Sequence, residues 1–427
     1  MKIAIFWFRR DLRLEDNSAL LAALKSGYQV LPIFIFDQNI LSDLPRQDAR
    51  LGFIYDLLTD INTSLHEFES GVKCLYGSPL DVWKFLIKTF DVSSVFINKD
   101  YEPYARKRDQ EITTLLSENG IPLYTFKDQV VFEENEILKA DGNPYTIFTP
   151  YKNKWLSLFN SEIFSSETPN FKALYKQTQT LPPLSSMNFK VATIKVKPYD
   201  LSSLNEYSKS RDFPSTDNTS YLSPHLRFGS VSVRKIISTL NESDNIFLSE
   251  LIWREFFMQI IYHFPKVITE NFKVKYDSII WRNNQEEFEK WCVGKTGYPM
   301  VDAGMRQLNA TGYMHNRVRM VTASFLCKHL LIDWRWGEAY FAEKLLDYEL
   351  SSNNGNWQWS AGTGCDATPY FRVFNPTSQQ QKFDKEGMYV KKWIPELDSL
   401  DYVTPIVDHK LARDRALNTY KNGLEAH

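Results

Sequence analysis

The first 130 residues alternate short apolar runs with amphipathic stretches, and this alternation restricts the fold more than any other feature of the chain. It predicts strands at Ile3–Trp7, Val30–Phe36, Val72–Tyr76, Ser94–Ile97 and Leu123–Phe126. The first helical pattern between them follows Asp16 and Asn17, which are good N-cap residues, and runs to Gly27. We therefore expect an α/β domain with a five-stranded, doubly wound parallel sheet that helices cover on both faces.

No GxGxxG motif follows any of these strands. The fingerprint of a dinucleotide site is therefore missing where a Rossmann-type enzyme carries it. We expect a cofactor, if there is one, to bind elsewhere in the chain.

The rest of the chain has two parts of different character. Residues 131–197 are rich in Ser, Thr, Pro, Lys and Asn with little periodicity, which predicts an interdomain connector. Residues 198–427 show helical patterns almost throughout, which predicts an all-α C-terminal domain. The expected order is thus an α/β domain over 1–130, a connector and a helical domain.

Composition excludes several classes of protein. The chain has 50 Lys plus Arg against 52 Asp plus Glu, so any contact with nucleic acid must come from a local basic patch. No apolar stretch reaches the ~18 residues of a membrane span. The four cysteines lack CxxC or Cys/His spacing, so we expect no metal site, no disulfide framework and a reducing, cytoplasmic location.

Two segments of the predicted helical domain combine charged, hydroxyl and aromatic side chains. In DNTSYLSPHLRFG, residues 217–223 could hold a phosphate or could simply cap a helix. In SELIWREFF, Glu250, Trp253 and Arg254 share one helix face. The alternative there is a core tryptophan beside a surface ion pair.

Two later segments show the same pattern. Asn316, Arg319 and Met320 share one side of a helix from which Arg317 points away, so a phosphate-bearing ligand or a solvated face would fit. In the segment NNGNWQW, the two tryptophans, at positions 357 and 359, do not share a face. They therefore have two different aromatic roles, or both belong to a core.

Eight segments of the chain, in order, resemble motifs of the photolyase/cryptochrome family: FWFRRDLRLEDN, TSYLSPHLRFGS, ELIWREFF, GKTGYPMVDAGMRQL, MHNRVRMVTASF, DWRWGE, NNGNWQW and YFRVFNP. Their variants are most similar to the class I cyclobutane pyrimidine dimer photolyases. The resemblance implies an N-terminal α/β antenna domain and a helical catalytic domain that holds FAD in a U-shaped conformation.

The resemblance also implies the residues that contact FAD. They are Tyr207, Thr219, Ser220, Leu222, Ser223, Arg254, Arg319, Asp347, Glu349 and Asn353. Asn353 matches the residue beside flavin N5, where a neutral amide can hydrogen-bond the reduced flavin without adding charge. Glu349 stands where close relatives carry Asp.

Two further sets of residues follow from the resemblance. The pocket for a flipped-out thymine dimer matches Glu250, Trp253, Asn316, Arg317, Met320 and Trp359. The electron path from the surface to photo-excited flavin matches Trp357, Trp334 and Trp281.

The implied activity is light-driven repair of pyrimidine dimers in DNA, in which excited FADH⁻ donates an electron to the dimer and takes it back. DNA that contains a pyrimidine dimer is then the partner, and we expect a monomer with no membrane contact and no obligate protein partner. Two alternatives remain, a blue-light signalling cryptochrome and a six-four photolyase. Plant-type cryptochromes tend to carry Asp at the position of Asn353, and the six-four pocket uses histidines where this chain has only His315.

A second, antenna chromophore is a further expectation. Tyr104 and Ala105 stand where folate-binding relatives have an Asn–Glu pair, which disfavours folate. The residues Arg10, Arg50, Asp100 and Glu102 resemble those of members that accept a deazaflavin or FMN. An empty antenna site is the other possibility.

Overall fold

The computed structural model describes residues 2–160 and 168–425, and the chain divides into two compact units. The first unit comprises Met1–Ile137, Lys154–Tyr199 and Tyr221–Glu242, and the second comprises Leu138–Asn153, Asp200–Ser220 and Ser243–His427. The units therefore alternate along the chain, and the three-part division expected from the sequence stays a prediction about folding domains.

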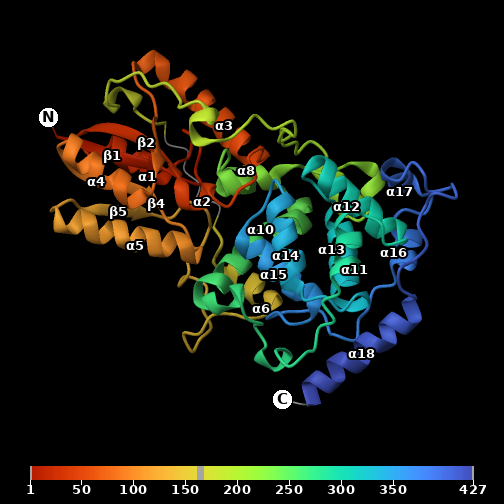
Figure 1. Cartoon of the computed structure of the whole chain (residues 1–427). Helices are drawn as coiled ribbons and strands as arrows, with labels where there is room; N and C mark the ends of the chain where they lie inside the picture. The colour runs from red at the N-terminus through yellow and green to blue at the C-terminus, as the bar shows by residue number, and fades with distance from the viewer. Residues whose placement is uncertain (1, 161–167, 426–427) are drawn as a thin grey trace. The chain divides into compact units, whose positions relative to one another are not determined.

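The five predicted strands form one parallel sheet in the first unit (Figure 1). Its strand order is β3-β2-β1-β4-β5, so the direction of winding reverses at β1. In sheets of this kind, ligands bind at the carboxyl ends of the strands beside the reversal point. The strands are β1 (Ile3–Phe8), β2 (Gln29–Asp37), β3 (Lys73–Gly77), β4 (Val92–Asn98) and β5 (Leu123–Phe126).

Helices cover both faces of the sheet because its strands are apolar on both sides. Ala4, Phe6 and Phe8 of β1 share a core with helices α1 (Ser18–Leu24) and α3 (Ala49–Leu65). The alternate β1 residues, from Ile3 to Trp7, share the other core with α4 (Pro79–Thr89) and α5 (Pro103–Glu118). Helix α2 (Gln38–Leu41) follows β2 directly. The doubly wound sheet predicted from the sequence is thus confirmed.

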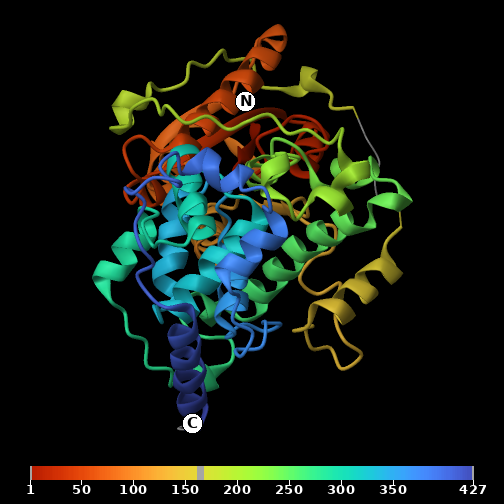
Figure 2. The same ribbon diagram turned by 90° about the vertical axis from the view of Figure 1, so that its right-hand side faces the viewer.

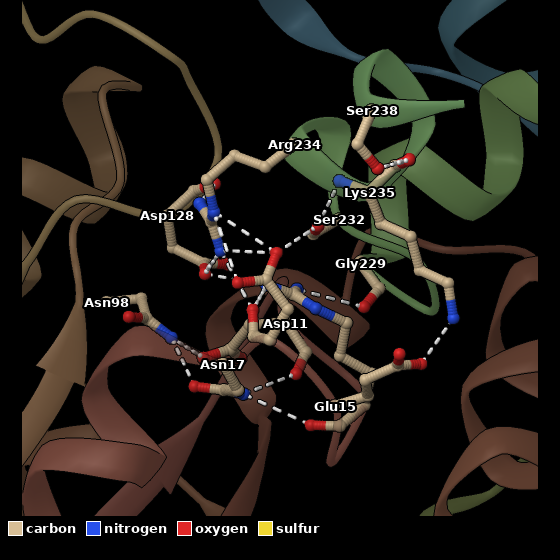
Figure 3. A network of polar contacts seen from close by, with 12 residues as sticks. Asp11, Glu15, Asn17, Asn98, Asp128, Gly229, Ser232, Arg234, Lys235 and Ser238 are labelled. Atoms are coloured by element: carbon tan, nitrogen blue, oxygen red, sulfur yellow. Dashed lines mark hydrogen bonds and ion pairs between the residues drawn. The ribbon is translucent and has the colours of Figure 1, made fainter. Parts of the chain in front are cut away.

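A buried polar network joins helices α8 (Leu222–Phe228) and α9 (Val233–Ser238) to the sheet within the first unit (Figure 3). Arg13 and Arg234 both donate to Asp128 Oδ1, at 2.6 and 2.8 Å. Burial disfavours the Asp128 carboxylate, but the two guanidinium groups outweigh this effect and lower its pKa. Gly229 has a φ of +69°, and a Cβ there would lie 2.1 Å from the Arg10 carbonyl oxygen, so only glycine allows this approach.

The second unit is helical, and most of its helices enclose one aromatic core that includes Trp291, Phe325, Trp334 and Trp357. Helix α18 runs to the C-terminal end of the unit, drawn in dark blue in Figure 2, and packs through Ala416 and Tyr420. The helices are α7 (Tyr207–Ser210), α10 (Asn245–His263), α11 (Gln285–Cys292), α12 (Pro299–Thr311), α13 (Asn316–Ser324), a π-helix (Phe325–His329), α14 (Trp334–Lys344), α15 (Leu350–Ala361), α16 (Pro376–Phe383), α17 (Met388–Trp393) and α18 (His409–Glu425).

The stretch predicted as a connector contains helix α6 (Phe148–Leu158), which the sequence pattern did not predict. Residues 138–153, with the first turns of α6, pack within the second unit. In the described part of the chain, no helix is both long and apolar enough to cross a bilayer. The described residues also contain no group of three His, Cys, Asp or Glu side chains that could hold a metal ion.

Candidate functional site

Helix α15 lies at the centre of the candidate site, because α10, α13 and α14 all pack against it. These four helices carry most of the residues that the sequence singled out. Helix α15 ends at Gly362, whose φ of +91° lets the chain leave the helix. Three pairs of polar residues surround its first turns.

The first pair is Asn353 on α15 and Glu338 on α14. Asn353 Nδ2 donates to Glu338 Oε1 at 2.8 Å and to the Glu338 carbonyl oxygen at 3.1 Å. Burial raises the pKa of the Glu338 carboxyl, and the hydrogen bond from Asn353 opposes this shift. Because both contacts use the amide nitrogen, the orientation of the Asn353 side chain is fixed.

The second and third pairs are ionic and lie before and at the start of α15. Arg319 Nη2 donates to Asp347 Oδ2 at 2.8 Å, and Arg254 Nη2 donates to Glu349 Oε1 at 3.1 Å. The Asp347 Oδ1 atom is buried and has no hydrogen-bond partner among the described residues, and the same is true of the Ser351 hydroxyl. Buried polar atoms normally have partners, so these two are suited to a bound group that can hydrogen-bond.

Glu250 on α10 pairs with Arg211, whose Nη1 lies 2.8 Å from Glu250 Oε1. Tyr207, one turn before Arg211, packs edge-on against Phe247. Burial, with the nearby Glu250 carboxylate, raises the pKa of Tyr207 to about 12. Glu250 therefore faces a guanidinium and a neutral phenol.

Arg317 on α13 points away from Arg319, as the helical spacing predicts. It pairs with Asp212 at 2.7 Å and lies over the ring of Phe383, 4.3 Å from the centroid. His315 caps α13, since its Nδ1 accepts the Arg317 backbone N–H at 3.2 Å. Burial lowers the pKa of His315 to about 4, which keeps this acceptor neutral.

The remaining predicted pocket residues differ in exposure. Asn316 is exposed at the start of α13, whereas Trp253, Met320 and Trp359 are half-buried. Trp253 stacks on Phe148, the first residue of α6. These side chains can therefore meet a ligand that approaches from solvent.

The three tryptophans predicted as an electron path run from the core outward. Trp357 and Trp334 are buried in the same core, and Trp281 packs half-buried against it. Trp357 lies against Gly337, where a Cβ would come within 2.1 Å of the indole. Gly337 is one helical turn after Trp334, so this glycine allows Trp357 to lie close to the helix that carries Trp334.

The predicted phosphate loop spans the boundary between the units. Tyr207, Thr219 and Ser220 belong to the second unit, whereas Leu222 and Ser223 begin α8 in the first. The N-cap residue of α8 is Tyr221, with a φ of +50° and no capping hydrogen bond from its side chain. The alternative reading of this segment, an ordinary helix cap made by a side chain, does not hold for α8.

Three of the four predicted antenna residues, Arg10, Asp100 and Glu102, follow the carboxyl ends of β1 and β4. Arg10 Nη1 lies 3.3 Å from Asp100 Oδ1 and 3.0 Å from Glu102 Oε1. Burial disfavours the Asp100 carboxylate, but Arg10 and three further arginines outweigh it and lower its pKa to about 2. Arg50 pairs with Asp48 at the start of α3. Tyr104 donates to Asp37, at the end of β2, at 2.6 Å.

Four residues of the site were missed from the sequence. Arg211, Asp212 and Phe148 lie far along the chain from their partners, so no local pattern marks them. Glu338 had a signal, because it ends the DWRWGE segment one turn after Trp334. No local pattern indicated that Glu338 pairs with Asn353.

In architecture, the molecule combines a doubly wound α/β unit with a helical unit whose polar pairs surround α15. Residues 4–172 match the family described as DNA photolyase, and residues 247–401 match the FAD binding domain of DNA photolyase. The chain is 37% identical to a deoxyribodipyrimidine photo-lyase of Vibrio cholerae, over 98% of this chain and 99% of the relative. It is 35% identical to that of Escherichia coli, over 99% of both chains.

Solved structures agree with these relatives. A bacterial class III photolyase from Agrobacterium tumefaciens superposes with a TM-score of 0.88 at 33% identity, covering 100% of this chain and 98% of that one. An archaeal photolyase from Sulfolobus tokodaii with two FAD molecules superposes with a TM-score of 0.85 at 34% identity, covering 99% of this chain and 100% of that one. The chain belongs to the DNA photolyase family, and it is an enzyme of the deoxyribodipyrimidine photo-lyase type. The resemblance inferred from the motifs is thus confirmed, whereas membership of class I stays a prediction.

Proposed function

We propose that this photolyase repairs cyclobutane pyrimidine dimers in DNA by a light-driven reaction with FAD bound to the helical unit. The observation that carries this proposal is the neutral amide of Asn353, which Glu338 holds in one orientation. Such an amide suits a site for reduced flavin, because it supplies a hydrogen-bond acceptor without adding charge.

The residues present fit FAD chemically. Asp347 Oδ1 and Ser351 Oγ are buried and lack partners among the described residues, so they are available to its hydroxyl and ring N–H groups. Arg254 and Arg319 add positive charge, and their ion pairs with Glu349 and Asp347 hold them in place. Within the helical unit, the hydroxyls and backbone N–H groups of Tyr207, Thr219 and Ser220 would bind phosphate oxygens.

When bound and reduced, FAD supplies on light absorption the electron that opens the cyclobutane ring, and it takes the electron back after the ring has split. The protein holds both groups in place for this step. Because Glu338 occupies the amide nitrogen of Asn353, the carbonyl Oδ1 is left to accept a hydrogen bond from the flavin.

The lesion would be held by residues on three helices. Trp253 and Trp359 provide ring faces for the two bases, and Met320 adds a flexible apolar contact. The Glu250 carboxylate would accept a hydrogen bond from a base N–H group of the flipped dimer, moving from its present partner Arg211. Asn316, exposed at the start of α13, would bind a base edge, and Arg317 would bind a phosphate.

Trp357, Trp334 and Trp281 would carry electrons that reduce oxidised flavin before repair. Trp357 and Trp334 are buried in one core and Trp281 reaches the surface, which supports a path for stepwise transfer. These residues would thus serve reduction of the cofactor and would not take part in repair itself.

We also propose a second chromophore, a deazaflavin or a flavin such as FMN, at the carboxyl ends of β1 and β4. The position beside the reversal point of the sheet supports this site, as do the charged residues Arg10, Asp100 and Glu102. The related archaeal structure contains two FAD molecules, which favours a flavin over a folate.

The test is repair by the purified, fully reduced protein of an oligonucleotide with one thymine dimer. Restored thymines are expected under near-ultraviolet or blue light and not in the dark. An FAD-loaded, reduced protein that leaves dimers intact under light would contradict repair and favour a signalling cryptochrome. Repair of six-four lesions alone would contradict the proposed substrate.

A further inference from the structure

Phe148, which belongs to the stretch that the sequence predicted as a connector, lies flat against Trp253. The two ring centroids are 3.6 Å apart and the planes differ by 9°. Phe148 is 8% exposed, and its backbone N–H donates to Asp366 Oδ2 at 2.9 Å. One face of the Trp253 indole is therefore covered by a buried ring.

Two further contacts hold the start of α6 on α10. The Tyr151 hydroxyl bonds Glu255 Oε1 at 3.2 Å, and both residues are buried. Lys152 Nζ donates to the Ser249 hydroxyl at 2.6 Å. Phe148 thus lies in a turn that is fixed to the helix carrying Glu250 and Trp253.

The surroundings of Trp253 restrict how a base can stack on it. Phe256 meets it nearly edge-on, at 5.6 Å and 77°, and Phe257 meets it at 5.3 Å and 30°. With Phe148 against one face, an incoming base has to use the remaining exposed part of this half-buried indole. A side chain that is held in one rotamer loses less entropy when a ligand binds.

We propose that Phe148 is a positioning residue for the damaged base: it holds Trp253 in the orientation that stacks on the lesion. Asp366 extends this role, because it joins Phe148 to the loop that follows α15, the helix that carries Trp359. The inference rests on the proposed function, since it concerns the same lesion pocket.

The test measures binding of the full-length, FAD-loaded protein to matched oligonucleotides with and without one thymine dimer. Phe148→Leu is expected to weaken binding to the damaged DNA about three- to tenfold and to leave binding to undamaged DNA unchanged, as for loss of one aromatic pair. Phe148→Tyr keeps the ring and should bind like the parent protein. Light-driven reduction of bound flavin should be the same in all variants.

Phe132→Leu is the matched control, because Phe132 is equally buried and packs on Trp155, a tryptophan outside the proposed pocket. It should leave the preference for damaged DNA unchanged. A second pair of variants tests the anchor without altering the stack: Asp366→Ala should weaken lesion binding, and Asp366→Asn, which keeps an acceptor oxygen, should restore it.

Three outcomes overturn the inference: unchanged lesion binding in Phe148→Leu, equal loss for both DNAs, or equal loss in Phe132→Leu. If Phe148→Leu does not retain its flavin, the two Asp366 variants provide the test instead. Equal binding of damaged DNA by Asp366→Ala and Asp366→Asn then overturns the inference. Trp253→Ala separates this inference from the proposed function. Unchanged lesion binding in Trp253→Ala contradicts the pocket itself, whereas loss in Trp253→Ala but not in Phe148→Leu contradicts only the role of Phe148.

Discussion

Replacing Glu338 should change the reduction potential of the bound flavin, although Glu338 is proposed to act only through Asn353. Glu338→Ala removes the 2.8 Å hydrogen bond from Asn353 Nδ2 but leaves the 3.1 Å bond to the backbone carbonyl of residue 338. The Asn353 amide then keeps one of its two hydrogen bonds to residue 338. The free energy that favours its observed orientation should therefore fall by about 1–2 kcal/mol. If that orientation stabilises reduced flavin, the two-electron potential should fall by about 20–45 mV.

The assay is a spectroscopic redox titration of the FAD-loaded variants. Glu338→Gln keeps an acceptor oxygen at the same position and should titrate like the parent protein. Glu343→Ala, an exposed position on the same helix, is the control for a general effect on α14. An Ala variant that retains FAD but shifts by less than about 10 mV would refute the reasoning, because such a shift is below ~0.5 kcal/mol. An equal fall in the Gln variant would refute it as well.

Three other predictions test separate parts of the molecule. Trp357→Phe should abolish light-driven reduction of oxidised flavin but leave repair by reduced enzyme largely intact; equal loss of both in a folded, FAD-loaded protein would mean that Trp357 is structural. Asp128→Ala should lower the free energy of unfolding by about 3–5 kcal/mol in chemical denaturation, because it removes the carboxylate that pairs with buried Arg13 and one of the two carboxylates that pair with Arg234, and Asp128→Asn should cost less. Between pH 6.5 and 4 the unfolded chain binds a proton that folded His315 does not, so stability should fall as the pH drops. His315→Asn can still cap α13 but does not bind this proton. In this variant the free energy of unfolding, from denaturation curves between pH 6.5 and 4, should fall less steeply with pH, by at most about one bound proton. An unchanged slope would contradict the assignment.

Local patterns predicted the secondary structure well where burial is continuous. All five strands were placed within two residues of their ends. β1 and β2 are buried on both faces and appear as apolar runs, whereas β3 and β5 are partly exposed and were predicted from shorter apolar patterns. Helix α6 was missed, since its apolar side chains lie among polar, Pro-rich segments. Its start belongs to the second unit and its later residues belong to the first.

The candidate site shows the same limit. Helical spacing alone indicated that Arg317 and Arg319 diverge and that Trp357 and Trp359 face different sides, because the helix period fixes these relations. The structure places Arg317 with Asp212 and Arg319 with Asp347, and it buries Trp357 while leaving Trp359 half-exposed.

The doubly wound sheet, the helical C-terminal part and the family were all predictable from the sequence, because strand and helix periods and short motifs are local properties of a chain. Which residues act in pairs depends on how the helices pack in three dimensions. Glu338 meets Asn353 across two helices, and Phe148 meets Trp253 from a position 105 residues earlier. Such contacts arise when separate elements pack together, so their energy depends on the three-dimensional arrangement and leaves no periodic signal in the sequence.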